Sequence, residues 1–525
     1  MSPRRAAADS RGMALALGFA LVASVWAAFA AAETPARAAS ASSVGRVFDV
    51  RGYGALGNGV HDDAPAVNRA IAAANRAGGG VVELPPGTYL AGRSIHMLSN
   101  VTLRVDAGAT LLGGEYGYDP PEQNPYARYE DTGHSHFHDA VIWGEDVHDI
   151  GFVGAGTIDG AGHLLTGQPI GGRADKLISL AVCDGLTISG LTLERGGHFA
   201  ILINDCKDVR SNGLRILTAD DRDGWDVDNS QDVRITNLVD HAYDDALAFK
   251  SEWALGATLP SGDVTVTHAH LSSVCCNALM FGSETCGDFT GYRFSHIVIT
   301  GAGKSGLGMV SMDGGHISDV DYSDIAMSGV AGPIMEKIGI RRSCGGDPGI
   351  GGISDIHYEN VTGTSLGMYS PTLWGEAGHA ITNVTFEHVR LAFPGGHAAT
   401  SLAVPSDDPY LYNPDTIGPR PAYAFYLHEV AGIYFRDSSL LPAAGEARPP
   451  FVLNEASGVD FERVTAQSGW EVPFDIALQG VSGVRVTESE STGGRSLSVN
   501  LPCGLSPPAL DCLTLEPWFV SYTFP

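Results

Sequence analysis

The chain has 525 residues, a formal net charge of −28 and 67 glycines, and 44% of its residues are hydrophobic. A charge this negative opposes binding to nucleic acid or to an anionic membrane surface, so we expect neither among the partners. The length exceeds that of a usual single globular core, unless a repeat extends the fold along one axis. We therefore expect a soluble, folded and monomeric protein.

The N-terminal segment has the pattern of a secretory signal peptide. Three arginines precede an apolar run from Met13 to Phe29, and small residues follow through Ala32. The run is nearly long enough to span a membrane, but its alanine-rich end favours cleavage. We expect a signal peptide over residues 1–32, a linker over residues 33–43, and a secreted protein that is extracellular or periplasmic.

Residues 44–97 are expected to form an N-terminal cap. A strand and a glycine-rich turn come first, and a helix is expected from about Pro65, with Asp63 near its N-cap and Gly78 at its end. Its apolar face consists of Val67, Ile71 and Ala74. Such a helix can cover the open end of a stack of strands, where unpaired edges would otherwise invite association.

A short phrase recurs along the rest of the chain. It reads CDGLTISGLTL from Cys183, CKDVRSNGLRI from Cys206, SQDVRITNLVD from Ser230 and SGDVTVTHAHL from Ser261, with weaker copies further on. Short alternating β runs at this spacing, separated by Gly, Asn and Asp, predict an all-β fold, a parallel β-helix over residues 98–525.

A Pro-rich insertion at about residues 394–423 interrupts the late coils. It is expected either to form a rim over a groove or to pack on a late coil.

The strands that precede each phrase can be aligned from coil to coil. Period-2 alternation predicts two inward columns, Ile201, Trp225, Leu247, Leu279 and Leu307, and Ile203, Val227, Phe249, Phe281 and Met309. Asp226 and Asp228 then point outward. The same register stacks Asp223 on Asp245 at one inter-strand spacing, ~4.8 Å, and places Asp228 beside Lys250.

Three aspartates are the candidate catalytic residues: Asp223 in DRDGWDVDNS, and Asp244 and Asp245 in YDDALAFKS. Carboxylates brought this close shift one another's pKa, which is costly unless the shift is used. Acid–base cleavage of a glycosidic bond is the commonest use, because it needs one protonated and one ionised carboxyl.

Seven outward-facing residues around these aspartates are the candidate substrate-binding residues: His198, Arg222, Asp226, Asp228, Lys250, Asn277 and Glu284. For two of them a second role stays open. Asp228 could serve only as the ion-pair partner of Lys250, and Glu284 could cap a turn.

Eight cysteines suit an oxidising compartment. The best candidate for a disulfide is Cys503–Cys512, which brackets a short Pro-containing loop. Cys183 and Cys206 are expected to stack as small core residues on neighbouring coils, and Cys276 to be an inert, partly buried thiol. No pair has C-x-x-C spacing, so we expect no metal site and no cofactor.

These motifs resemble those of the polygalacturonase-like glycoside hydrolases, glycosidase family 28, within the pectin-lyase-like β-helix superfamily. The family's N-T-D-G-x-D is here DRDGWD, and its D-D-C-I-A-I-K-S is here DDALAFKS. YGALGNGVHDDAPAVNRAI and ELPPGTYL resemble the superfamily's N-terminal cap, and PDTIGPRPAYAFYLHEVAGIYF resembles a segment of bacterial members. The resemblance covers most of the mature chain and implies a right-handed parallel β-helix with an N-terminal capping helix.

The resemblance also implies a reaction, the hydrolysis of a plant-wall polysaccharide with inversion. Asp244 would protonate the leaving oxygen, and Asp223 and Asp245 would position and deprotonate the water. Coil stacking alone gives a carboxyl separation near the ~5–5.5 Å of retaining enzymes, so inversion follows from the resemblance only.

Two departures from the family pattern concern the substrate. The family's G-H-G aligns with Cys275-Cys276-Asn277, so its histidine is Cys276 here, and its R-I-K aligns with Gly308-Met309-Val310. A uronate would therefore lose its bidentate arginine partner, which predicts a substrate other than plain polygalacturonate.

Two other functions remain open. One is a calcium-dependent polysaccharide lyase, with Lys250 as the base and Asp226 and Asp228 on the metal. The other is a glycan-binding β-helix without catalysis.

Overall fold

The computed structural model describes residues 45–130, 132–470 and 472–500. The expected signal peptide and linker, and the cysteines Cys503 and Cys512, lie outside these residues. The chain divides into Met1–Gly45 and Arg46–Pro525, and the second unit holds almost the whole described part. No helix within the described ranges is long and apolar enough to cross a membrane.

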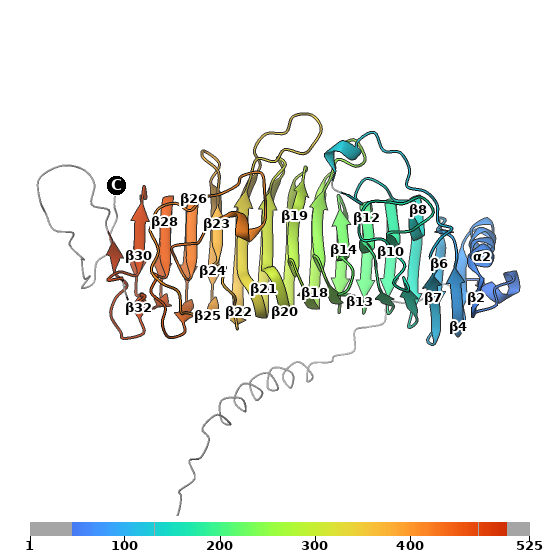
Figure 1. Cartoon of the computed structure of the whole chain (residues 1–525), viewed down its shortest axis with the longest axis horizontal. Helices are drawn as coiled ribbons and strands as arrows, with labels where there is room; N and C mark the ends of the chain where they lie inside the picture. The colour runs from blue at the N-terminus through green and yellow to red at the C-terminus, as the bar shows by residue number, and fades with distance from the viewer. Residues whose placement is uncertain (1–44, 131, 471, 501–525) are drawn as a thin grey trace, which may run out of the picture. The chain divides into compact units, whose positions relative to one another are not determined.

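The fold is a right-handed parallel β-helix, in which three ladders of parallel strands run along one stack of coils (Figure 1). The first, here called the site ladder, pairs β5 (Ile95–His96), β8 (Ala140–Gly154), β10 (Lys176–Ser189), β12 (Phe199–Asn212), β14 (Asp223–Asp228), β17 (Leu247–Ser251), β19 (Leu279–Thr285), β20 (Phe289–Ser311), β21 (His316–Ile338), β23 (Thr372–Trp374), β26 (Phe425–Arg436), β28 (Phe451–Glu462), β30 (Ile476–Gln479) and β33 (Val499–Asn500).

Several of these strands are long enough to bend through a turn and join a second ladder. That ladder adds β1 (Val47–Asp49), β3 (Gly80–Leu84), β6 (Val101–Val105), β15 (Gln231–Thr236), β18 (Ser261–Ser273), β22 (Gly352–Thr364), β24 (Ile381–Glu387) and β31 (Arg485–Thr487). The third ladder adds β2 (Asn58–Asp62), β4 (Gly87–Ala91), β7 (Ala109–Gly113), β9 (Thr157–Asp159), β11 (Thr192–Glu194), β13 (Arg215–Thr218), β16 (Val239–Ala242), β25 (Arg390–Phe393), β27 (Ser439–Pro442), β29 (Thr465–Ala466) and β32 (Glu490–Ser491).

The core lies between the ladders, and the predicted inward columns are confirmed. The register pairs Ile201 with Trp225, Leu247, Leu279 and Leu307 in succession, and Ile203 with Val227, Phe249, Phe281 and Met309. All ten side chains are buried. On the second ladder an aromatic column, Phe294, Tyr322, Tyr358, Phe386, Phe435 and Phe461, stacks at ring-centroid spacings of 4.9 to 5.2 Å. Stacking at the strand spacing keeps the interior continuous from coil to coil.

The predicted capping helix is also confirmed. Helix α2 spans Ala64–Arg76, with Pro65 in its first turn, and it lies at the N-terminal end of the stack in Figure 1. Its buried residues include Val67, Ile71 and Ala74. The Asp63 carboxylate does not bond to the helix itself but accepts hydrogen bonds from the backbone of Leu56 and Gly57, 2.8 and 3.0 Å long. Asp63 therefore ties the glycine-rich turn to the start of the helix.

Two segments without repeat phrases pack over the site ladder. The first cover, residues 114–139, joins β7 to β8 and includes η2 (Ala127–Tyr129). It contacts the turn after β17, because Asn124 Nδ2 donates to the carbonyl of Ala254 at 2.8 Å. The second cover, residues 394–424, is the Pro-rich insertion and includes η3 (Pro414–Thr416). It lies against β21, where Lys337 Nζ donates to the carbonyl of Asp408 at 3.0 Å.

The expected stacking of Cys183 and Cys206 in the core on neighbouring coils is confirmed. The expectation that Cys276 is a thiol is wrong, because all six described cysteines are in disulfides. The ladder register pairs Cys183 with Cys206, and they form one disulfide across neighbouring coils. Cys276 is bonded to its neighbour Cys275. The third disulfide, Cys286–Cys344, joins the turn after β19 to the segment after β21. Sequence spacing missed the first pair because a cysteine that faces inward also suits an apolar core.

Candidate active site

The site ladder brings the three candidate catalytic aspartates together. Asp223 begins β14, and Asp244 and Asp245 directly precede β17 on the next coil. The backbone N–H of Gly224 donates to the carbonyl of Asp245 at 2.9 Å, so the two coils are in direct contact here. Asp223 and Asp245 are 3% and 6% exposed, whereas 20% of the Asp244 side chain is exposed. Asp244 is therefore the carboxylate most open to an incoming molecule.

The three carboxylates share one electrostatic environment. Burial raises the pKa of Asp245 to about 6, and the charge of Asp244 adds to this shift. Burial also raises the pKa of Asp223 well above its usual value, with the charges of Asp226 and Asp244 as the next causes. The Asp244 carboxylate accepts a hydrogen bond from Arg222 Nη2 at 3.0 Å. Close acids with raised pKa values hold a proton near neutral pH, which acid–base catalysis requires.

The raised pKa of Asp245 predicts that folding stability falls as pH rises. Its folded-state pKa, about 6, exceeds the usual value for an aspartate, 3.8. The stabilisation from the bound proton is thus fully present below the unfolded pKa and is lost as pH rises through about 6. Asp245→Asn should remove roughly 3 kcal/mol of this pH dependence, at 1.36 kcal/mol per pKa unit.

Chemical denaturation of wild type and Asp245→Asn between pH 4 and 8 measures this effect. The matched control is Asp263→Asn, since the Asp263 side chain is 70% exposed. An Asp245→Asn variant with the same stability-versus-pH slope as wild type would contradict the prediction.

Asn277 holds Asp245 in place. Its backbone N–H and its Nδ2 both donate to Asp245 Oδ1, each at 2.8 Å. Its own Oδ1 accepts from the backbone N–H of Ser305 at 3.1 Å. Because Asn277 is only 2% exposed, these bonds make it a positioning residue for Asp245.

Lys250 pairs with Asp226 and not with Asp228, contrary to the expectation from the register. Lys250 Nζ lies 2.7 Å from Asp226 Oδ2, 3.6 Å from Asp223 Oδ2 and 3.7 Å from Glu284 Oε2. Asp228 is opposite Lys250 in the backbone register, but the long lysine side chain reaches across to the acids on its other side.

Asp226, Asp228 and His198 are buried in this structure and offer almost no surface to a substrate. Asp226 and Asp228 are 0% exposed, and His198 is 1% exposed. The His198 ring stacks on Phe199 with centroids 4.5 Å apart, and burial lowers its pKa, with the charge of Arg222 as the next cause. The neutral ring of His198 therefore packs beneath the site.

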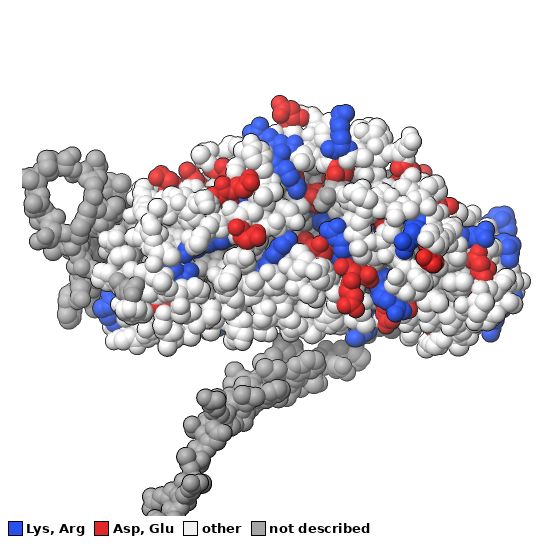
Figure 2. Space-filling view, in the orientation of Figure 1, with Lys and Arg blue, Asp and Glu red and all other residues white. Residues whose placement is uncertain are grey.

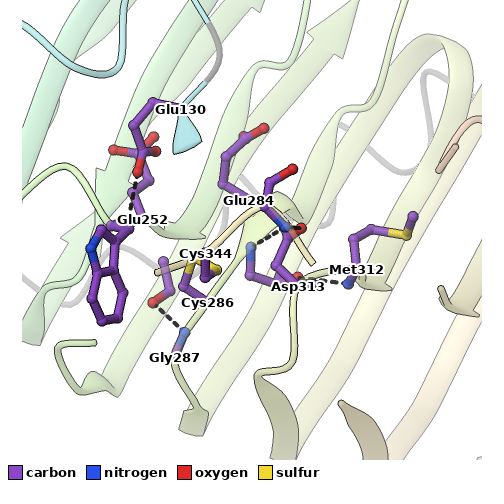
Figure 3. Close-up of a disulfide and its surroundings, with 12 residues drawn as sticks. Glu130, Glu252, Glu284, Cys286, Gly287, Met312, Asp313 and Cys344 are labelled. Carbon is purple, nitrogen blue, oxygen red and sulfur yellow. Dashed lines mark hydrogen bonds between the residues drawn. A yellow bond between two sulfur atoms is a disulfide. The ribbon is translucent and has the colours of Figure 1, made fainter. Parts of the chain in front are cut away.

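Glu284 lies beside Lys250 and pairs with Arg341. The Glu284 carboxylate accepts from Ser283 Oγ at 2.7 Å and lies 3.5 Å from Arg341 Nη1. Arg341 is itself engaged by Asp313, with Nε donating to Oδ1 at 2.9 Å. The disulfide Cys286–Cys344, drawn in Figure 3, links the turn after β19 to the segment that carries Arg341.

An apolar cluster surrounds positions 308 and 310, with which the family's uronate-binding cations are aligned in the sequence resemblance. Gly308 pairs with Met280 in the ladder, and Val310 packs with Ala248, Met280 and Met312. Tyr412 from the second cover packs against this cluster, and Lys304 Nζ lies 5.2 Å from the centroid of its ring. The Cys275–Cys276 disulfide lies beside Asp244, with both sulfurs within 4.8 Å of an Asp244 oxygen.

Sequence reasoning missed the site residues that the repeat does not carry. His134 and Glu130 come from the first cover, Tyr412 from the second cover, and Arg341 from the segment after β21. Loops of this kind lack periodicity, so their sequence gives no register with which to place them. Glu252 could have been found, because it directly follows Ser251, the last residue of β17, and lies two residues after Lys250.

Comparisons with known proteins identify the family of this chain. The family model of glycosyl hydrolases family 28 matches residues 100–408, more than half of the chain, and that of rhamnogalacturonase A/epimerase, pectate lyase-like, matches residues 47–111. Polygalacturonase QRT2 of Arabidopsis thaliana is 25% identical over 340 residues, which cover 61% of this chain and 72% of that protein.

Solved structures show the same fold. The family 28 exopolygalacturonase of Yersinia enterocolitica has a TM-score of 0.57 at 18% identity and covers 87% of this chain and 80% of its own. The exopolygalacturonase of Thermotoga maritima has a TM-score of 0.56 at 17% identity, with 66% and 87% covered. The family model covers residues 100–408, which include most strands of the site ladder. This chain therefore belongs to glycosyl hydrolases family 28 and is a polygalacturonase-like glycoside hydrolase.

Proposed function

We propose that this protein hydrolyses a glycosidic bond in a pectin-type plant-wall polysaccharide, with Asp223, Asp244 and Asp245 as its acid–base residues. The observation that carries the proposal is the convergence of these carboxylates from two successive coils, where burial raises the pKa of two of them. The relatives named polygalacturonase support the substrate class.

Asp244 is proposed as the acid that protonates the leaving oxygen, since it is the most exposed of the three. Arg222 holds the Asp244 carboxylate in the free protein. When substrate enters, this contact must loosen and the proton that the group holds must move from Asp223 or Asp245 to Asp244, which leaves the other two carboxyls as bases. Asp223 and Asp245 would then position and deprotonate the water, giving inversion at the anomeric carbon. Proton NMR of the first product formed reports the anomer directly.

The surroundings of the carboxylates support a substrate other than plain polygalacturonate. A uronate carboxylate is bound best by a bidentate arginine, but positions 308 and 310 carry glycine and valine within an apolar cluster. Of the nearby cations, Arg341 is engaged by Asp313 and Lys250 by Asp226, and Lys304 lies over the ring of Tyr412. Figure 2 shows acidic and basic side chains interspersed on the face that it draws. A neutral or differently linked sugar at the cleaved bond fits these residues better.

Initial rates on polygalacturonate and on neutral plant-wall glycans test this specificity. We expect the rate on the preferred neutral or mixed glycan to exceed that on polygalacturonate by at least about tenfold, since a lost charged hydrogen bond costs about 1.5–3 kcal/mol. Faster cleavage of polygalacturonate would contradict the specificity. Binding of every glycan without turnover of any would contradict hydrolysis itself and favour a glycan-binding β-helix.

The buried ion pair of Lys250 with Asp226 does not favour the lyase alternative, because a lysine that abstracts a proton must be deprotonated and reach the sugar. Elimination would also leave an unsaturated product with ultraviolet absorbance. Its appearance in the same assays would overturn the hydrolytic proposal.

A further inference from the structure

A buried group of one imidazole and two carboxylates lies beneath the first cover, beside the proposed active site. His134 comes from the first cover, Asp228 ends β14, and Glu252 follows β17. Each offers one ligand atom, and these atoms lie within 4.8 Å of one another. His134 is 3% exposed and both acids are 0% exposed, so water does not reach them.

The atoms that face one another in this group lack ordinary partners. Within the described residues, both oxygens of Asp228 are buried without a hydrogen bond, and so are Glu252 Oε1 and His134 Nδ1. His134 Nδ1 is in contact with Glu252 Oε1 and lies 3.8 Å from Asp228 Oδ2. The outer oxygen of Glu252 is satisfied, since Oε2 accepts from Asn204 Nδ2 at 3.2 Å. Unpaired buried carboxylate oxygens that converge on one point are unstable unless a positive charge compensates them.

The nearby lysine forms no ion pair with either acid of this group among the described residues. Lys250 Nζ is committed to Asp226 at 2.7 Å and touches this group only through His134 Nε2, at 3.3 Å. A second buried group, His136, Asp139 and Asp175, shows the contrast: Lys176 Nζ lies 2.7 Å from Asp175 and 3.7 Å from Asp139. That group contains its own cation, whereas the group of His134 does not.

We propose that His134 Nδ1, Asp228 and Glu252 bind one divalent transition-metal ion of the zinc or manganese kind, which fastens the first cover to β14 and β17. An imidazole nitrogen with carboxylate oxygens is a donor set for such ions, whereas calcium prefers six to eight oxygens. Glu130 lies close by on the same cover, as Figure 3 shows beside Glu252, and its Oε2 is buried without a hydrogen bond. It is available as a further ligand.

A proton is the competing occupant. Without an ion, Lys250 donates to His134 Nε2, so the ring proton lies on Nδ1 and points at Glu252. With an ion on Nδ1, the ring proton moves to Nε2 and Lys250 keeps only Asp226. In the ion-bound state the Nε2–H faces the Lys250 ammonium, so the lysine must turn away from His134. The two states also differ in metal content, which makes them separable.

The test uses the full chain, loaded separately with Zn²⁺, Mn²⁺ or Ca²⁺ and dialysed before elemental analysis by mass spectrometry. We expect about one equivalent of Zn²⁺ or Mn²⁺ to remain bound. Chelator should lower the thermal midpoint by at least about 3 °C, and adding the ion back should restore it. These readouts need no substrate, so the test of the metal site is independent of the proposed hydrolysis.

Asp228→Asn and Glu252→Gln preserve side-chain volume while removing one ligand charge each. Both should lose the bound ion and become insensitive to chelator. The matched control is Asp437→Asn, from the surface-lying group Glu387, His388 and Asp437, and it should keep the ion.

Less than about one tenth of an equivalent in loaded wild type, with a midpoint indifferent to chelator, would overturn the proposal in favour of a buried proton. Retention of Ca²⁺ alone would overturn the assigned ion class. Full metal content in both variants would overturn the assigned ligands. If neither variant folds, the metal content of the wild-type protein and its response to chelator still decide whether this site binds a metal ion.

Discussion

Replacing Asp244 by asparagine is expected to lower the hydrolysis rate by a factor of about 10² to 10⁴, the usual contribution of a positioned proton donor. Asparagine has the same shape, and its Oδ1 can still accept the hydrogen bond from Arg222 that Asp244 accepts at 3.0 Å. What it cannot do is transfer a proton to the leaving oxygen. Because Asp244 is partly exposed, the fold should tolerate the change.

Steady-state kinetics on the substrate found by the glycan comparison measure this loss, which should fall on kcat more than on KM. Circular dichroism and the thermal midpoint check that the variant is folded. The control Asp263→Asn removes an exposed aspartate from the second ladder and should retain the wild-type rate. A folded Asp244→Asn protein with more than about one tenth of the wild-type rate would exclude Asp244 as the acid.

Replacing Lys250 by methionine is expected to destabilise the fold by about 3–5 kcal/mol, the cost of breaking a buried ion pair on one side. Lys250 is 4% exposed and lies among Asp223, Asp226 and Glu284. Methionine fills most of the same volume but leaves these acids without their shared cation. The loss of the positive charge that these acids share is therefore the dominant effect of the change.

Urea denaturation measures this loss, and Lys207→Met is the control, since Lys207 is an exposed residue of β12. Lys207→Met should change the free energy of unfolding by less than about 0.5 kcal/mol. Adding Asp226→Asn to Lys250→Met should recover part of the loss, because the pair is removed together. A Lys250→Met variant as stable as wild type would mean that the acids are neutral before the lysine is removed.

The fold was predictable because the repeat phrases, the apolar columns and the capping residues all indicate the same architecture. The repeat phrases give the coil length, the apolar columns give the register, and Asp63, Pro65 and Gly78 give the cap. The columns from Ile201 to Leu307 and from Ile203 to Met309 align without a slip, since a slip of one residue would turn each apolar side chain outward. The disulfides were not predictable, because pairing depends on distances in space that spacing along the chain does not give.

The sequence by itself determined that Asp223 and Asp245 meet across neighbouring coils, with Asp244 beside them. Parallel strands pair at a constant spacing, so the alternation of apolar residues along the sequence shows which residues of neighbouring coils lie opposite one another. Only the tertiary structure decided which outward side chains face solvent and which lie under a cover. Asp226 and Asp228 alternate outward like any exposed residue, yet the first cover buries them beside His134.

That difference has one physical cause. A ladder repeats the same hydrogen bonds at every coil, so its register can be read from periodicity alone. The covers have no period, and their position depends on individual contacts such as Asn124 with Ala254 and Lys337 with Asp408. Those contacts set the burial of the acids, and burial sets which of them can hold a proton, a lysine or a metal ion.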